Sequence, residues 1–96
     1  MRVLIIGAGQ VGHAVTAALH ASHELTVVDL DASLLAQLTD RYDVMTVAGN
    51  GTSRATLDRA GIASAGLVIV ATDRDEVNIV AALQARSLTQ ARIVVR

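Results

Sequence analysis

The sequence contains no cysteine, proline, tryptophan or phenylalanine, and Tyr42 is its only aromatic residue. Without cysteine the chain can form neither a disulfide nor a thiolate zinc site, as is typical of proteins in a reducing compartment. Without a proline-rich linker its 96 residues have no obvious internal boundary, so we expect one small domain. Hydrophobic residues make up 52% of the chain, which is enough apolar surface for a folded core.

Two further absences exclude classes of partner. The net charge is −1 and all eight basic residues are arginine, so the chain carries no basic excess for a nucleic-acid backbone. One aromatic side chain gives no platform on which bases could stack. No stretch reaches the roughly 18 consecutive apolar residues that a membrane span requires. We therefore expect a soluble domain with no nucleic-acid partner.

Short apolar runs alternate with segments of helical spacing along the whole chain. The runs predict strands over 3–6, 25–28, 44–47 and 67–70, and a fifth strand from 93. The run at 67–70 has no polar alternation, so we expect that strand to be buried on both faces. The helical spacings predict helices over about 10–21, over 34–38, around residue 57 and through residue 85.

Polar residues at the starts of three predicted helices are candidate N-caps. Asp31 precedes the second helix, and Thr52 or Ser53 precedes the third. Asp73 with Glu76 three residues later has the spacing of a capping box for the fourth. The helix boundaries are thus predicted from capping chemistry as well as from periodicity.

Strands that alternate with helices imply right-handed βαβ crossovers and a parallel sheet. We predict an α/β, Rossmann-like, doubly wound domain over residues 1–96, with at least five strands in the order 3-2-1-4-5. Because this fold usually continues to a sixth strand, we expect the chain to be a C-terminally truncated fragment of a longer protein.

The first strand ends in a glycine-rich turn that opens the first helix, Gly7-Ala8-Gly9-Gln10-Val11-Gly12. A GxGxxG turn between strand and helix is typical of dinucleotide binding. Gly7 permits the tight turn, Gly9 lets a pyrophosphate approach the backbone, and Gly12 lets the helix pack closely on the strand. The amides at the helix start, at positions 10 and 11, would face an anion along the positive end of the helix dipole.

Because the strand order reverses between the first and fourth strands, a ligand crevice should lie above their carboxyl ends. Just past the strand ends lie Asp29, Asn50, Thr72 and Asp73. Asp29, seventeen residues after Gly12, should accept hydrogen bonds from an adenosine ribose and repel a 2′-phosphate. This favours NAD or an adenine mononucleotide over NADP.

No arrangement of residues predicts a metal site. His20 and His23 are three residues apart but have no third ligand nearby, so we expect them to stabilise a helix C-terminus. Asp73, Asp75 and Glu76 lie at a helix start, where the helix dipole already favours acidic residues.

Four segments together resemble the RCK/KTN (TrkA-N) family, and the resemblance covers essentially the whole chain. The family supplies the nucleotide-binding regulatory domains of Trk and Ktr potassium uptake systems and of many potassium channels. The segments are the first twelve residues, Val28-Asp29-Leu30-Asp31, Gly49-Asn50-Gly51-Thr52 and Ala71-Thr72-Asp73-Arg74-Asp75-Glu76-Val77-Asn78.

The resemblance implies a cytoplasmic regulatory module, peripheral to the inner face of the membrane, that binds NAD(H), or alternatively ATP or ADP. Its partner would be a membrane-embedded potassium transporter or channel subunit, and it would form a homo-oligomer, a dimer or an octameric ring. The implied nucleotide contacts are residues 7–12, Asp29, Asn50, Thr72, Asp73 and, at the end of the chain, Arg96.

Two other function classes stay open at this point. The chain could be the coenzyme-binding half of a small NAD-dependent oxidoreductase, but such an enzyme needs an acid or base against the nicotinamide, usually from residues beyond the fifth strand. It could also be an interaction module with a vestigial site, which would bind no nucleotide. We expect no enzymatic activity, because the candidate residues include no nucleophile paired with a base and the chain has no lysine.

Overall fold

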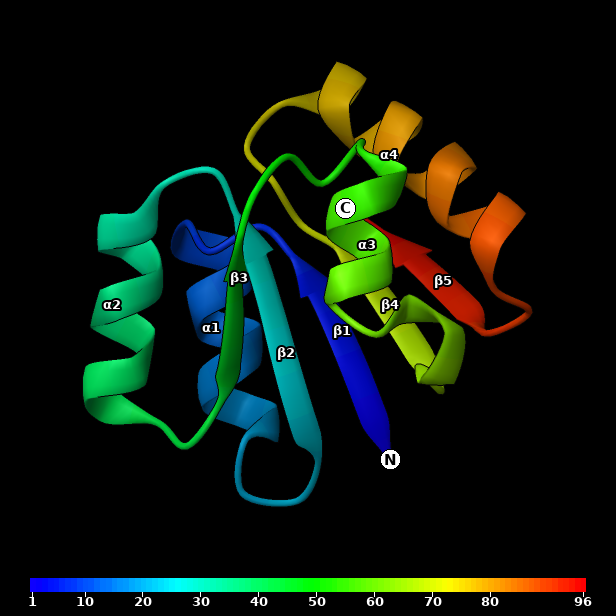
Figure 1. Cartoon of the computed structure of the whole chain (residues 1–96). Helices are drawn as coiled ribbons and strands as arrows, with labels where there is room; N and C mark the ends of the chain where they lie inside the picture. Colours follow the sequence, from blue (N-terminus) through cyan, green and yellow to red (C-terminus); the bar gives the residue numbers. More distant parts are fainter.

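Five parallel strands form a single sheet in the order β3-β2-β1-β4-β5 (Figure 1). The computed structural model describes residues 1–96. The predicted fold class and strand order are confirmed, and the strand boundaries differ from the predicted ones by at most one residue, with β4 as predicted. The strands are β1 (Arg2–Ile6), β2 (Glu24–Asp29), β3 (Met45–Ala48), β4 (Leu67–Val70) and β5 (Arg92–Val95).

Helices cover both faces of this sheet, as expected where βαβ crossovers connect parallel strands. One face carries α1 (Gln10–Leu19) and α2 (Ala32–Arg41). The other carries α3 (Arg54–Arg59), the short 3₁₀ helix η1 (Ile62–Ser64) and α4 (Asp75–Leu88) (Figure 1). The 3₁₀ helix was not predicted from the sequence.

Each face of the sheet holds its own hydrophobic core. Along β1, Val3 and Ile5 belong to the core under α1 and α2, whereas Leu4 and Ile6 belong to the core under α3 and α4. This explains why the first apolar run has no polar alternation.

Strand β4 departs from the expectation of burial on both faces. Val68 and Val70 are fully buried beneath α3 and α4, but Leu67 and Ile69 are only half-buried on the other face. On that face they pack at the margin of the core that α1 and α2 form over β1 and β2, which includes no fully buried residue of β4.

The capping predictions were confirmed at two helices and wrong at the third. Asp31 caps α2, because its Oδ1 accepts hydrogen bonds from the backbone N–H of Ser33 at 2.9 Å and of Leu34 at 3.4 Å. Ser53, one of the two predicted alternatives, caps α3.

The predicted capping box at the start of α4 does not form. The N-cap residue of α4 is Arg74, so Asp73 lies outside the helix. The Thr72 hydroxyl accepts a hydrogen bond from the Arg74 N–H at 3.3 Å, which forms a side-chain turn before the helix begins. Glu76 accepts a hydrogen bond from the Arg74 guanidinium instead of closing a box with Asp73.

The start of α1 lies in direct contact with the end of β1. Gly7 has φ +115°, and a Cβ at this residue would lie 2.7 Å from the carbonyl oxygen of Ala71 in the neighbouring β4 turn. A Cβ at Gly12 would overlap the carbonyl oxygen of Gly7 itself. Both positions therefore require glycine, as the motif predicted.

This contact predicts that two glycine-to-alanine changes differ in their effect on the free energy of unfolding. Helix propensity alone would make Gly12→Ala stabilising by about 1 kcal/mol. Because the new methyl group would overlap the Gly7 backbone, we expect a loss of about 2–3 kcal/mol. Gly9→Ala is the matched control, since a Cβ there would meet nothing within 4 Å. Denaturant unfolding of both variants tests this, and a Gly12→Ala variant as stable as the parent would contradict it.

The Asp31 cap predicts a component of stability that is lost in acid. Hydrogen bonds from the side chain and the backbone N–H of Ser33 lower the pKa of Asp31 below its ordinary 3.8. A carboxyl group whose pKa is lower in the folded state stabilises the fold above its unfolded pKa and loses that contribution as the pH falls. The stability difference between the parent and Asp31→Ala should therefore be full at neutral pH and shrink below about pH 4. Urea unfolding across this range measures it, and a difference independent of pH would refute it.

Candidate nucleotide-binding site

A hollow lies where the carboxyl ends of β1, β2 and β4 meet the loop after β3. The strand order reverses between β1 and β4, and a doubly wound sheet binds ligands at such a point. The predicted residues Gly7, Asp29, Asn50, Thr72 and Asp73 all line the hollow. The full lining is Ile6, Gly7, Val28, Asp29, Leu30, Gly49, Asn50, Gly51, Thr72, Asp73, Arg74 and Val77.

The other residues of the glycine motif lie beside the hollow and differ in what they offer a ligand. Ala8 is buried in the core under α1 and α2, and Gly12 is buried against Gly7. The first α1 amide with a backbone acceptor is that of His13, which donates to the Gly9 carbonyl at 2.8 Å. The N–H groups one turn earlier, at positions 10 and 11, are therefore available to an anion.

Asp29 connects the glycine motif to the end of β2. Its Oδ2 accepts a hydrogen bond from the Ala8 N–H at 2.8 Å, and its Oδ1 accepts one from the Asp31 N–H at 2.8 Å. These bonds fix the half-buried carboxylate beside the glycine turn. Each oxygen keeps a further lone pair for a ligand. The sequence predicted the ligand-facing role of Asp29 but not its anchoring of the turn.

Asn50 holds the loop after β3 by accepting two hydrogen bonds on one atom. Its Oδ1 takes the N–H of Thr52 at 2.9 Å and the Thr52 hydroxyl at 2.7 Å. The next residue, Gly51, lies so close to the end of β1 that a Cβ there would overlap the Ile6 side chain. The side-chain NH₂ of Asn50 is the group that remains for a ligand.

Thr72 contributes the position of its loop rather than an available hydroxyl. The hydroxyl donates to Oδ1 of Asn78 at 2.5 Å, and the Thr72 N–H donates to the same oxygen at 3.0 Å. Asn78 returns a hydrogen bond from its Nδ2 to the Thr72 carbonyl at 3.1 Å and is only 1% exposed. Sequence reasoning did not single out this role of Asn78, although a polar residue on the apolar face of α4 was the available signal.

The end of the chain lies next to the same loop. The Arg96 guanidinium donates to the Thr72 carbonyl at 3.2 Å, and its backbone N–H donates to the Val70 carbonyl at 2.8 Å. Arg96 is thus brought to the edge of the site but does not line the hollow.

Sequence reasoning also missed Arg74, which lines the hollow beside Asp73. Its Nε and Nη2 lie 2.8 Å and 2.7 Å from the same oxygen of Glu76. The pKa of the Glu76 carboxyl is lowered, first by a hydrogen bond from the backbone N–H of Glu76 and then by the hydrogen bond from the Arg74 side chain.

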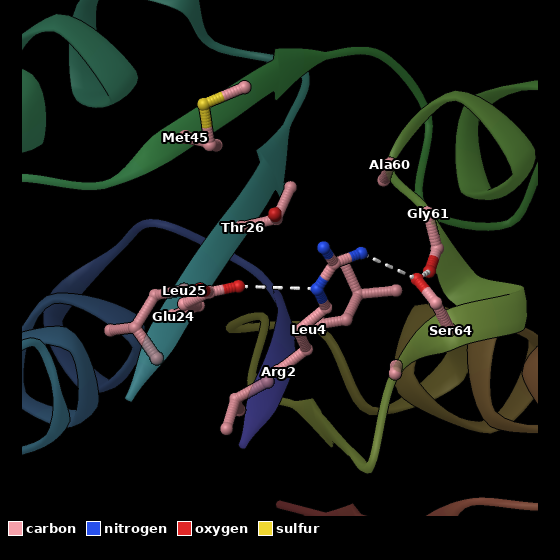
Figure 2. A pocket seen from close by; sticks show the side chains of 11 residues that line it. Arg2, Leu4, Glu24, Leu25, Thr26, Met45, Ala60, Gly61 and Ser64 are labelled. Atoms are coloured by element: carbon pink, nitrogen blue, oxygen red, sulfur yellow. Dashed lines mark hydrogen bonds and ion pairs between the residues drawn. The ribbon is translucent and has the colours of Figure 1, made fainter. Parts of the chain in front are cut away.

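A second hollow lies at the opposite, amino ends of β1 and β2 (Figure 2). Arg2 reaches across it, with Nε 3.2 Å from the Glu24 carboxylate and Nη1 donating to the Ser64 hydroxyl at 3.2 Å. Its charged groups therefore pair with one another. None of the residues predicted to bind a ligand lines this hollow.

No group of three or more histidine, cysteine or acidic side chains is placed to hold a metal ion. No helix has the length and apolar character that crossing a membrane requires.

Sequence comparison gives a family match and curated relatives. The family model of the TrkA-N domain matches residues 3–96. A Trk system potassium uptake protein TrkA from Halomonas elongata is 44% identical over 91 residues, which is 92% of this chain and 20% of that protein. A TrkA homolog from Archaeoglobus fulgidus is 30% identical over 96 residues, which is all of this chain and 22% of that protein. The chain thus spans about a fifth of the length of these relatives.

Solved structures share the fold at lower identity. The TrkA-N domain of the inner membrane protein ybaL from Escherichia coli superposes with a TM-score of 0.86 at 24% identity, covering 99% of this chain and 71% of that one. The Kef C-terminal domain of Shewanella denitrificans in its AMP-bound form superposes with a TM-score of 0.83 at 24% identity, covering 100% of this chain and 58% of that one.

A 3-hydroxyacyl-CoA dehydrogenase from Archaeoglobus fulgidus gives a TM-score of 0.78 at 16% identity, covering 99% of this chain and 33% of that one. The fold alone is therefore shared with an enzyme as well as with a domain of an inner membrane protein. The match over residues 3–96 and the relatives at 30% identity and above decide the family. This chain belongs to the TrkA-N domain family.

Proposed function

We propose that this domain binds NAD(H), or alternatively ATP or ADP, in the hollow above β1 and β4, and that the bound nucleotide regulates potassium transport by a membrane partner. The observation that carries the proposal is the pairing of Asp29 with the glycine turn. One carboxylate oxygen holds the Ala8 amide, so an acceptor for a ribose and donors for a phosphate lie side by side.

The ligand would lie across the site in a defined direction. Its adenosine ribose would donate to Asp29, while its phosphates would cross Gly9 towards the N–H groups at positions 10 and 11. A Cβ on Gly9 would meet nothing within 4 Å, so the backbone there is open to close approach. Asn50, Asp73 and, from the edge, Arg96 are the proposed further contacts.

The transport role rests on the family. The relatives are potassium uptake proteins of Trk systems, and this chain matches about a fifth of their length. We propose a cytoplasmic homo-oligomer, a dimer or a ring of eight domains, held at the inner face of the membrane by a potassium transporter or channel subunit. A ligand that makes different contacts in two states of such an assembly shifts the equilibrium between those states through its differential affinity alone.

The oxidoreductase alternative has less support. No histidine, tyrosine, lysine or cysteine lines the hollow, so its lining offers only carboxylates as proton-transfer groups. The likeness to a dehydrogenase is one of fold at 16% identity. We therefore propose that the nucleotide is bound without being turned over.

Calorimetric titration with NADH, NAD, ATP and ADP tests nucleotide binding directly. We expect saturable binding of at least one of them, weakened about ten- to a hundredfold in Asp29→Ala through the loss of one or two charge-assisted hydrogen bonds. Because Asp29 also anchors the Ala8 amide, unfolding of the variant must be measured alongside. Asp29→Asn keeps an acceptor for that amide and is the matched control for the turn.

Two results of the titration would contradict the proposed contact at Asp29 or nucleotide binding itself. If Asp29→Ala folds and binds with the affinity of the parent, the ribose does not lie at β2. If the parent binds none of the four nucleotides, the domain is an interaction module with a vestigial site.

Potassium flux through the full-length protein and its membrane partner tests regulation. We expect flux to change when one nucleotide replaces another, and we expect Asp29→Ala to remove that response at nucleotide concentrations that saturate the parent. Flux that is indifferent to every nucleotide, or hydride transfer to a small substrate, would contradict a sensor.

A further inference from the structure

The side chains that line the hollow carry an unbalanced charge for a ligand with phosphates. Asp29 and Asp73 contribute two carboxylates, and Arg74 is the only basic residue in the lining. The chain has no lysine that could supply another cation. A nucleotide would therefore bring its own negative charge to a surface on which a single guanidinium opposes two acids.

Arg74 is held at the mouth of this hollow by a contact that is easily exchanged. Two of its guanidinium nitrogens converge on one oxygen of Glu76, at 2.8 Å and 2.7 Å, and Nη1 makes no hydrogen bond. The Arg74 and Glu76 side chains are 67% and 66% exposed. Exposed ion pairs contribute little to stability. A phosphate that offers a second oxygen to the planar guanidinium therefore competes well with Glu76.

We propose that Arg74 is the phosphate-binding cation of this site and that the phosphate of a bound nucleotide replaces Glu76 as its ion-pair partner. This inference rests on the proposed nucleotide function. The guanidinium forms parallel hydrogen bonds to two phosphate oxygens, as arginine commonly does. Arg74 thereby gives the site its preference for phosphorylated over unphosphorylated adenosine.

Two other arginines near the strand ends each donate one hydrogen bond to a backbone carbonyl. Arg96 donates to the Thr72 carbonyl at 3.2 Å, and Arg59 donates to the Ala48 carbonyl at 3.4 Å. Neither lines the hollow. Arg74 is also the N-cap residue of α4, so its backbone position is fixed by a helix while its side chain is held only by the exposed contact with Glu76.

The test compares ADP with adenosine on four variants of the 96-residue chain. Arg74→Gln should bind ADP about tenfold more weakly than the parent, the loss expected for a charge-assisted hydrogen bond, and adenosine equally well. Glu76→Gln, which removes the competing carboxylate, should bind ADP more tightly by a fewfold. Arg54→Gln is the matched control, because Arg54 forms a similar exposed pair with Asp58 on α3.

Calorimetry for ADP and NMR titration for adenosine give the affinities, with unfolding measured on each variant. Equal ADP affinity in Arg74→Gln and the parent, or an equal loss for ADP and adenosine, would overturn the assignment of Arg74 and leave the proposed function intact. An Arg96→Gln variant that loses ADP affinity while Arg74→Gln does not would also overturn it. A parent that binds neither ligand would overturn both proposals.

Discussion

The contact on which the rest of the site depends joins three backbone segments with no side chain between them. Gly12, at the start of α1, lies on the Gly7 carbonyl, and Gly7 lies against Ala71 at the end of β4. A Cβ at either glycine would overlap or crowd a neighbouring carbonyl oxygen. This close approach brings the unpaired amides of α1 to the point where the strand order reverses, and it leaves the turn within reach of Asp29.

The polar side chains around the hollow have two distinct uses, which their residue types alone do not reveal. The Thr72 hydroxyl and the Asn50 carboxamide oxygen satisfy their own loops and hold the backbone in place. Asp29 does the same for the glycine turn, yet its carboxylate keeps lone pairs that face the hollow. The side chains with capacity left for a ligand are therefore few, and the backbone amides become correspondingly more important.

The sequence predicts the fold well because apolar runs and glycines specify it locally. Val3 to Ile6 alternate between two cores, and Gly7 and Gly12 of the motif occupy positions where a Cβ would meet a backbone carbonyl oxygen. What the sequence does not reveal is which partner each polar group takes. Asp73 and Glu76 have capping-box spacing, but the Thr72 hydroxyl accepts the hydrogen bond of the Arg74 N–H, and Glu76 pairs with the Arg74 side chain. The buried role of Asn78 likewise depends on a loop that only the folded chain brings to it.

Two hollows at opposite ends of one sheet make the central claim testable in a single experiment. In a ¹H–¹⁵N NMR titration of the labelled chain with NADH or ADP, each backbone amide reports on ligand binding near it. We expect the amides that shift to belong to residues 7–12, Asp29, 49–52 and 72–74. If the shifts instead cluster at Arg2, Glu24 and Ser64, around the hollow of Figure 2, the nucleotide site has been placed at the wrong end of the strands.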